Sequence, residues 1–307
     1  MLAEPPATRA RPAGVIHDLG YQRYAGDRYG RAAIVRTLAG YSLRSAFGLG
    51  RGARAKIVPI SVFALMCLPA LVNAVLVARG GSRAFPYDTY SYPVRVVGMI
   101  IFLAAQAPEL VSRDLRHRVL PLYFARPLRP ADYPLAKLAA LITASLIVLD
   151  VPVLLLYVST IVGVHGPGAV WHQTALLLPG LAIGLLWAVV LPTIALAIAS
   201  FSGRRAIATG AVAGFFFLTW VLSQVLGTVA SGPRDPGAVT ASTGTHVAGL
   251  ISPFTLLDGV RQWLGGGLGV VPDPGDAWGT GYALLLAVLV AAGLAALVTR
   301  YRKVGAE

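Results

Sequence analysis

Apolar residues are gathered into six long runs, separated by polar intervals. A helix rises about 1.5 Å per residue and the hydrocarbon core of a bilayer is about 30 Å thick, so about 20 apolar residues cross it. Each run approaches or exceeds that length, so the pattern predicts six transmembrane helices. The predicted spans are 57–78, 94–110, 135–164, 175–201, 206–230 and 278–299.

The segment before the first run, residues 31–56, is amphipathic. Ile34, Leu38 and Tyr41 recur at helical spacing. They predict a connecting helix whose apolar face lies on the membrane interface, followed by a glycine-containing joint. Residues 1–30 contain no apolar run and are expected to form a disordered tail.

The interval before the last run, residues 231–277, is too long for a simple turn in a compact membrane bundle. Its middle is apolar but is interrupted by a proline and two charges. We therefore expect one or two short helices at the membrane surface or dipping into it, where protein or water satisfies their backbone.

Composition agrees with the pattern, because 56% of the residues are hydrophobic and only 13% are charged. A mean hydropathy of +0.69 is that of an integral membrane protein. The expected fold class is therefore all-α, with a six-span transmembrane domain over residues 57–307. The single cysteine, Cys67, lies in an apolar run, which excludes a disulfide framework and a cysteine metal site.

The net charge of +13 is distributed unevenly. Most cations lie in the N-terminal tail, between the second and third spans, at Arg204 and Arg205, and after the last span. By the positive-inside rule, both termini are cytoplasmic and the 231–277 loop is extracellular. Because the cations flank apolar spans, they indicate contact with membrane lipids and no nucleic-acid partner.

The interval between the second and third spans, residues 109–134, begins with a regular pattern. Val111, Leu115 and Val119 recur every four residues, with charges on much of the remaining circumference. This spacing predicts a short amphipathic helix ended by Pro121.

The return from that predicted helix is rich in proline. Pro127, Pro130 and Pro134 hold the chain extended, and Asp132 is expected to favour the N-terminus of the third span. The interval is therefore expected to be a rigid element that projects into the cytoplasm.

Asp150 lies near the middle of the third span, where a charge costs about 2.5 to 3.5 kcal/mol on insertion scales. It must therefore face protein or water. Two interpretations stay open: a gating, cation-contact or proton site, or a carboxyl group hydrogen-bonded beside the Pro152 kink.

Enzymatic motifs are missing from the sequence. No lysine follows a glycine, so no GxxxxGK[ST] phosphate loop exists, and neither HExxH nor GxSxG occurs. The histidines lack the spacing of metal ligands. We expect no catalytic site, no metal site and no cofactor bound by this chain.

Two stretches carry a resemblance. The segment "QAPELVSRDLRHRVLPLYFARPLRPADYPLAKL" resembles the cytoplasmic loop of ABC-2-type ABC transporter permeases, in which an acidic residue closes the second span before a coupling helix. "HDLGYQRYAGDRYGR" and "SLRSAFGLGRGARAKIVP" resemble the N-terminal region of bacterial, especially actinobacterial, members. The similarity extends over nearly the whole chain.

The resemblance implies the membrane subunit of an exporter in the bacterial cytoplasmic membrane. It would pair with a second permease subunit, as a homodimer or with a homologue, and with two separate ABC ATPase subunits that bind ATP and Mg²⁺. The residues that would transmit ATPase movement are Glu109, Arg113, Asp114, Arg116, His117 and Arg118. The helix with Ile34, Leu38 and Tyr41 would support them.

The resemblance also implies a pathway at the interface of two permease subunits. Its candidate lining residues are Asn73, Thr219, Ser223 and Gln224, with Asp150 as a candidate gate. Drugs, peptides, lipids and glycan precursors all suit such a pathway, and the direction of transport follows from the resemblance alone.

Two other function classes stay open, an ion-driven secondary transporter and a polytopic membrane enzyme. The first normally shows internal repeats and several ionisable groups in its spans. The second would need acids and histidines that converge near one membrane face, and only Glu109, Asp114 and His117 come close. Transport after ATP depletion would separate the first from an ABC exporter, and activity of the chain alone would favour the second.

Overall fold

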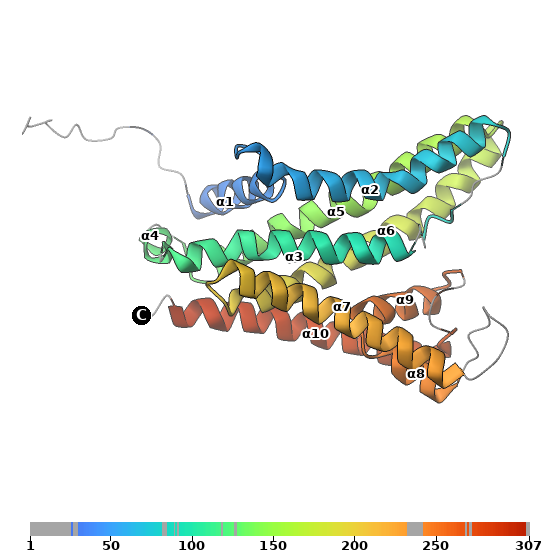
Figure 1. The fold of residues 1–307 in the computed structure, drawn as a ribbon. Helices are drawn as coiled ribbons and strands as arrows, with labels where there is room; N and C mark the ends of the chain where they lie inside the picture. The colour runs from blue at the N-terminus through green and yellow to red at the C-terminus, as the bar shows by residue number, and fades with distance from the viewer. Residues whose placement is uncertain are drawn as a thin grey trace, which may run out of the picture.

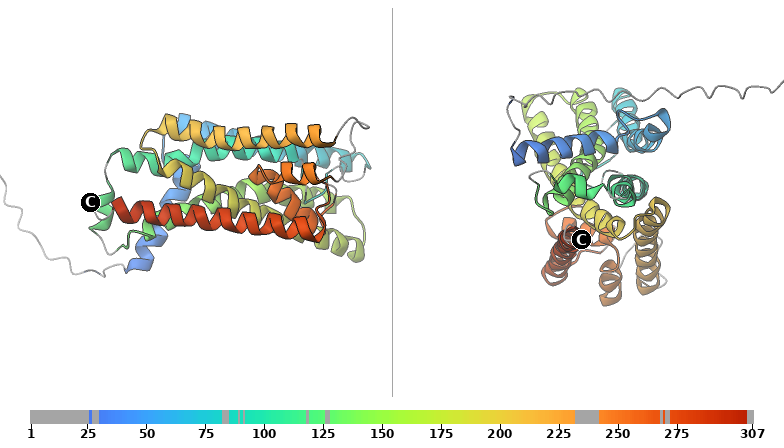
Figure 2. Two further views of the ribbon diagram at one scale, coloured as in Figure 1. Left: turned by 90° about the horizontal axis from the view of Figure 1, so that it is seen from below. Right: turned by 90° about the vertical axis from the view of Figure 1, so that its left-hand side faces the viewer.

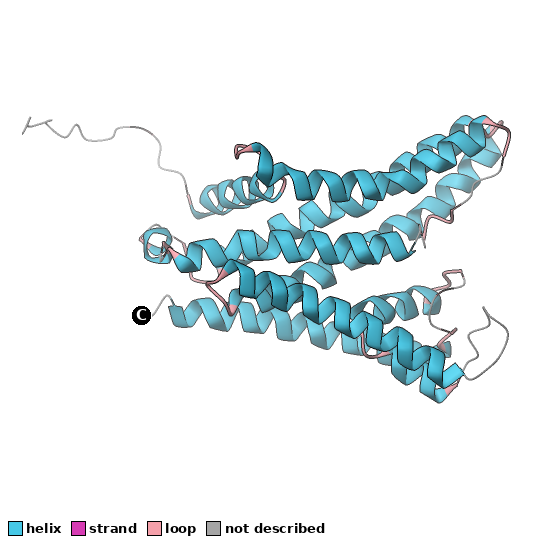
Figure 3. Cartoon of the chain, in the orientation of Figure 1, coloured by secondary structure: helices cyan, strands magenta, loops and turns pink. Residues whose placement is uncertain are grey.

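The computed structural model describes residues 26, 30–81, 85–88, 90, 92–117, 119–125, 128–231, 242–267, 269 and 272–304. Within these residues the chain forms ten α-helices and no β-strand (Figure 3). The tail predicted for residues 1–30, apart from two positions, and Arg118 lie outside the described residues.

Six of the helices are long and apolar enough to cross a membrane, which confirms the predicted all-α membrane fold. They run side by side along the bundle (Figure 1). Their bounds are α2 (Ala53–Ala78), α3 (Tyr92–Arg116), α5 (Asp132–Val162), α6 (Pro167–Ser200), α7 (Arg205–Ser231) and α10 (Gly275–Val304).

Helices α3 and α6 form the centre of the bundle. In the most apolar part of each helix, 78% of the α3 residues and 67% of the α6 residues are buried, against 22% for α7 and for α10. Helix α5 packs between α2 and α6, while α7 packs on α3 and α10 on α6. The outer helices therefore present apolar side chains outwards, as expected for lipid contact.

The two ends of the bundle differ in charge. One end carries α1 (Arg31–Ala46), α4 (Leu120–Phe124) and the ends of α3 and α10, and we call it the basic end because most of the described arginines and lysines lie there (Figure 1). The opposite end carries α8 (Thr243–Gly249) and α9 (Pro253–Trp263), which begin at the serine caps Ser242 and Ser252. These two helices confirm that short helices precede the last span.

Helix α2 contains Pro69, which has no N–H to donate. The hydroxyl of Tyr90 accepts a hydrogen bond from the Ala70 N–H (3.2 Å) and donates one to the Met66 carbonyl (2.7 Å). Ala70 and Met66 would otherwise pair with each other in the helix. A buried side chain is thus inserted into the helix ladder next to the proline, a recognised cause of helix bending.

Helix α1 crosses the basic end and packs against α5 (Figure 2). Its buried residues are Leu38, Ser42 and Ala46, whereas Ile34 is half-buried and Tyr41 is 70% exposed. A helix is thus present over this segment, and the contact of Ile34, Leu38 and Tyr41 with the membrane interface stays a prediction. Small side chains at 42 and 46 allow the close approach that a tyrosine ring would prevent.

The prediction of a separate amphipathic helix between Glu109 and Leu120 is wrong. Helix α3 continues to Arg116 through Pro108, and Pro121 lies in the first turn of the five-residue helix α4. The four-residue spacing of Val111 and Leu115 fits a helix that continues a span as well as it fits a separate one. Spacing alone could not distinguish the two.

Candidate coupling site at the basic end

The Glu109 side chain lies in the last turns of α3 and is only 5% exposed. Its carboxylate pairs with Nη2 of Arg51 at 2.5 Å, Nη1 of Arg205 at 2.8 Å and Nη1 of Arg113 at 3.9 Å. Arg51 belongs to the joint between α1 and α2, and Arg205 is the first residue of α7. One carboxylate therefore joins the beginnings of α2 and α7 to the end of α3.

Asp114 makes a second connection, between the end of α3 and the beginning of α5. Its Oδ2 accepts a hydrogen bond from the Tyr133 hydroxyl at 2.6 Å and lies 3.1 Å from Nζ of Lys137. The Lys137 side chain is only 7% exposed and its ammonium lies 5.4 Å from the centre of the Tyr133 ring. A buried ammonium without a counter-charge is strongly unfavourable, so Asp114 is required for this packing.

Asp132 makes a third connection, at the N-terminus of α5. Its carboxylate accepts the Arg129 backbone N–H at 2.9 Å and two hydrogen bonds from the Arg31 guanidinium, at 2.6 and 2.7 Å. The expected position of Asp132 at the N-terminus of the third span is confirmed. Its bidentate pair with Arg31 also connects α5 to the first residue of α1.

A cavity of about 790 Å³ opens between α1, α3 and α4. Arg51, Glu109, Arg113, Asp114 and Lys137 line it, together with apolar residues of α4 and its approach. The cavity thus contains both ion-pair clusters, and a partner that entered it would touch the groups that connect the helices.

The residues predicted to contact a partner divide into two sets. Arg113, Arg116 and His117 are exposed at the end of α3, whereas Glu109 is buried and Asp114 is largely turned towards α5. The three exposed residues can contact another protein directly. Glu109 and Asp114 can affect the neighbouring helices only through the cations with which they pair. Their role in coupling stays a prediction.

The residues proposed to line a pathway do not converge in one cavity. Asn73 donates hydrogen bonds to Ser159 (3.0 Å) and Thr160 (3.3 Å) between α2 and α5. Ser223 donates to the Ala248 carbonyl (2.7 Å) and lines a cavity of about 160 Å³ together with Gln224.

Neither of the remaining two residues lines that cavity. Thr219 donates to the carbonyl of Phe215 in its own helix. The Asp150 carboxylate packs against Gly184 of α6.

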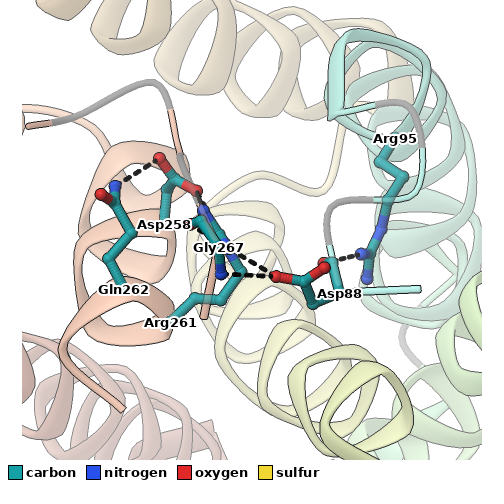
Figure 4. A network of polar contacts seen from close by, with 6 residues as sticks. All are labelled: Asp88, Arg95, Asp258, Arg261, Gln262 and Gly267. Carbon is teal, nitrogen blue, oxygen red and sulfur yellow. Dashed lines mark hydrogen bonds and ion pairs between the residues drawn. The ribbon is translucent and has the colours of Figure 1, made fainter. Parts of the chain in front are cut away.

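The opposite end contains a buried charge network that sequence reasoning missed (Figure 4). Nη1 of Arg261 lies 2.6 Å from Asp88, and its Nε donates to Asp258 at 3.0 Å. Arg95 of α3, only 1% exposed, donates to the Asp88 carbonyl at 3.1 Å and lies 4.8 Å from the centre of the Trp187 ring. No spacing along the chain relates these residues, since Asp88 and Arg261 are 173 positions apart.

The pairing of Glu109 with Arg51 and Arg205 was also missed. A lone acid at the end of an apolar span indicates that cations lie nearby, but several arginines could have supplied the charge. In comparisons with known proteins, no protein-family model and no curated sequence matches the chain.

Proposed function

We propose that this chain is the membrane subunit of an ABC-2-type exporter in the bacterial cytoplasmic membrane. The observation that carries the proposal is the Glu109 cluster, which joins α2, α3 and α7 at the end where Arg113, Arg116 and His117 are exposed. In a permease of this kind, the exposed residues would receive the movement of the ATPase and the buried cluster would distribute it.

The mechanism follows from the three connections. A displacement of the turn after α3 would act through Glu109 on the starts of α2 and α7, and through Asp114 and Lys137 on α5. The pair of Arg31 and Asp132 would carry it to α1. Movement at the end of α3 would thereby be transmitted to α1, α2, α5 and α7.

The proposed assembly contains two such permease chains and two ATPase chains, which would bind ATP and Mg²⁺ because this sequence has no phosphate loop. The basic end would face the cytoplasm, with both termini there.

Purification from the native membrane in lipid nanodiscs tests the proposal. We expect a second chain that has a phosphate loop and hydrolyses ATP to copurify. Arg116→Glu should release that chain, while Arg302→Glu, at another exposed cation of the basic end, should retain it. Repeated recovery of the wild-type chain alone would count against the proposal.

An ion-driven transporter is the second candidate, and one observation favours it. Arg95 and Asp150 both lie within membrane helices, Arg95 is 1% exposed, and each has a buried polar atom without a hydrogen bond among the described residues. Transport that persists after ATP depletion, and stops when the ion gradient is removed, would favour this candidate.

A further inference from the structure

A second cavity, of about 420 Å³, lies at the opposite end of the bundle. It is bounded by the first half of α6, the connection between α2 and α3, and the turn after α9. The residues important here are Tyr87, Asp88, Pro179, Ile183, Arg261 and Leu264. The volume falls in the usual range of small-ligand sites, about 300 to 1,000 Å³.

One wall of this cavity is apolar and includes leucine side chains that are exposed. Leu176 of α6 and Leu264 after α9 both line it, and their exposed fractions are 38% and 67%. Leu178, in the same part of α6 but outside the lining, is 63% exposed. An aliphatic chain could therefore enter from the bilayer along α6 without first crossing water.

The polar side of the cavity is Asp88. Its Oδ2 accepts hydrogen bonds from Nη1 of Arg261 (2.6 Å) and the Gly267 N–H (3.2 Å), and its side chain remains 17% exposed. The Arg261 side chain is only 4% exposed and also donates to the Gly267 carbonyl (2.9 Å). The carboxylate is thus held in place by buried donors, and it is the more accessible of the two charges.

Within the described network the charges balance, because Asp88 and Asp258 stand against Arg261 and Arg95. Asp88 is the carboxylate of this network that lines the cavity, whereas the Arg261 guanidinium is almost fully buried against it. A cationic group that enters the cavity therefore meets an accessible carboxylate of opposite charge, while an anion would meet a like charge.

We propose that this cavity binds a single-chain amphiphile with a positively charged amine. The ammonium group lies at the Asp88 carboxylate, and the aliphatic chain lies along Leu176, Pro179 and Ile183 of α6. Binding does not require an ATPase partner, so the test of this site does not depend on the proposed function.

Photolabelling of the purified chain in nanodiscs tests the site. The probe is a dodecylammonium that carries a diazirine in its chain, compared with the alcohol and the carboxylate of the same chain. We expect labelling of the peptides that contain Leu176 to Ile183 and Arg261 to Gly267, competed by unlabelled dodecylammonium. Equal labelling by all three head groups would show simple partition into lipid and would overturn the proposal.

Variants separate the cavity from the charge. Ala182→Trp fills the cavity from an exposed lining position and leaves the ion pairs intact, whereas Leu178→Trp adds the same bulk outside it. We expect labelling to be lost in the first variant and kept in the second. Unchanged labelling of Ala182→Trp would remove the site.

Asp88→Asn tests the head-group contact. Hydrogen bonds to charged groups contribute about 1.5 to 3 kcal/mol, so the preference for the amine over the alcohol should fall by at least about tenfold. Gel filtration checks that this variant is folded, since it also loses the pair with Arg261. A preference that persists in folded Asp88→Asn would refute the contact.

Discussion

Replacing Glu109 with glutamine removes one negative charge and keeps the shape of the side chain. In the folded protein, Arg51 and Arg205 then lose a carboxylate at 2.5 and 2.8 Å, while Arg113 loses one at only 3.9 Å. The three guanidinium groups also remain close to one another without a counter-charge. We therefore expect both stability and coupling to decrease.

The expected loss in the free energy of unfolding depends on how exposed each arginine partner of Glu109 is. A hydrogen-bonded charge pair contributes about 1.5 to 3 kcal/mol, and the Arg51 partner, with 28% of its side chain exposed, belongs near the lower end of that range. The Arg205 side chain is 62% exposed, so its pair adds at most about 1 kcal/mol. The free energy of unfolding should fall by about 2 to 3 kcal/mol.

Denaturant unfolding of the purified chain, followed by tryptophan fluorescence, measures this loss. Arg113→Gln is the matched control, because its longer and exposed pair should change the free energy of unfolding by less than about 0.5 kcal/mol. A double-mutant cycle of Glu109→Gln with Arg51→Gln should give a coupling energy of about 1 kcal/mol or more. If Glu109→Gln unfolds like the wild type, the carboxylate does not hold these helices together.

Three further predictions concern other parts of the bundle. Asp114→Asn leaves the buried Lys137 ammonium without its counter-charge and should lower the free energy of unfolding by about 2 to 4 kcal/mol; an unchanged denaturation midpoint would contradict this. Gly184→Ala adds a methyl group that would overlap the Asp150 carboxylate, so it should lower the melting temperature. Gly210→Ala adds its methyl group to open space and should leave the melting temperature unchanged or raise it. Burial lowers the pKa of His246 below its ordinary value of 6.5, so the unfolded chain binds a proton first and stability should fall as the pH decreases below 6.5. His246→Gln should flatten this dependence in thermal unfolding between pH 7.5 and 5.5, and an equally steep dependence in the variant would assign it to another group.

The spans could be predicted because lipid imposes a local rule, a minimum length of apolar helix, that each segment satisfies by itself. All six predicted spans correspond to helices, and the short helices before the last span were also expected. The charge at the N-terminus of α5 was predictable for the same reason, since a helix end favours an acid whatever its tertiary surroundings.

The errors concern contacts between distant segments. The spacing of Val111 and Leu115 could not show whether their helix continues the second span, because both arrangements present the same face. The buried face of α1 depends on how closely α5 approaches, so the sequence alone could not show that Ser42 and Ala46 are buried. The partners of Glu109 and of Asp88 lie in other helices, so only the packed bundle identifies them.

Crosslinking from position 116 of the assembled complex tests the proposed coupling. A Cys67→Ala background removes the only cysteine, and Arg116→Cys then carries a photoreactive crosslinker at the exposed end of α3. The proposal predicts an adduct with a chain that contains a phosphate loop, and a change in its yield between ATP-bound and nucleotide-free membranes. Adducts with lipid alone, in membranes where transport is active, would contradict it.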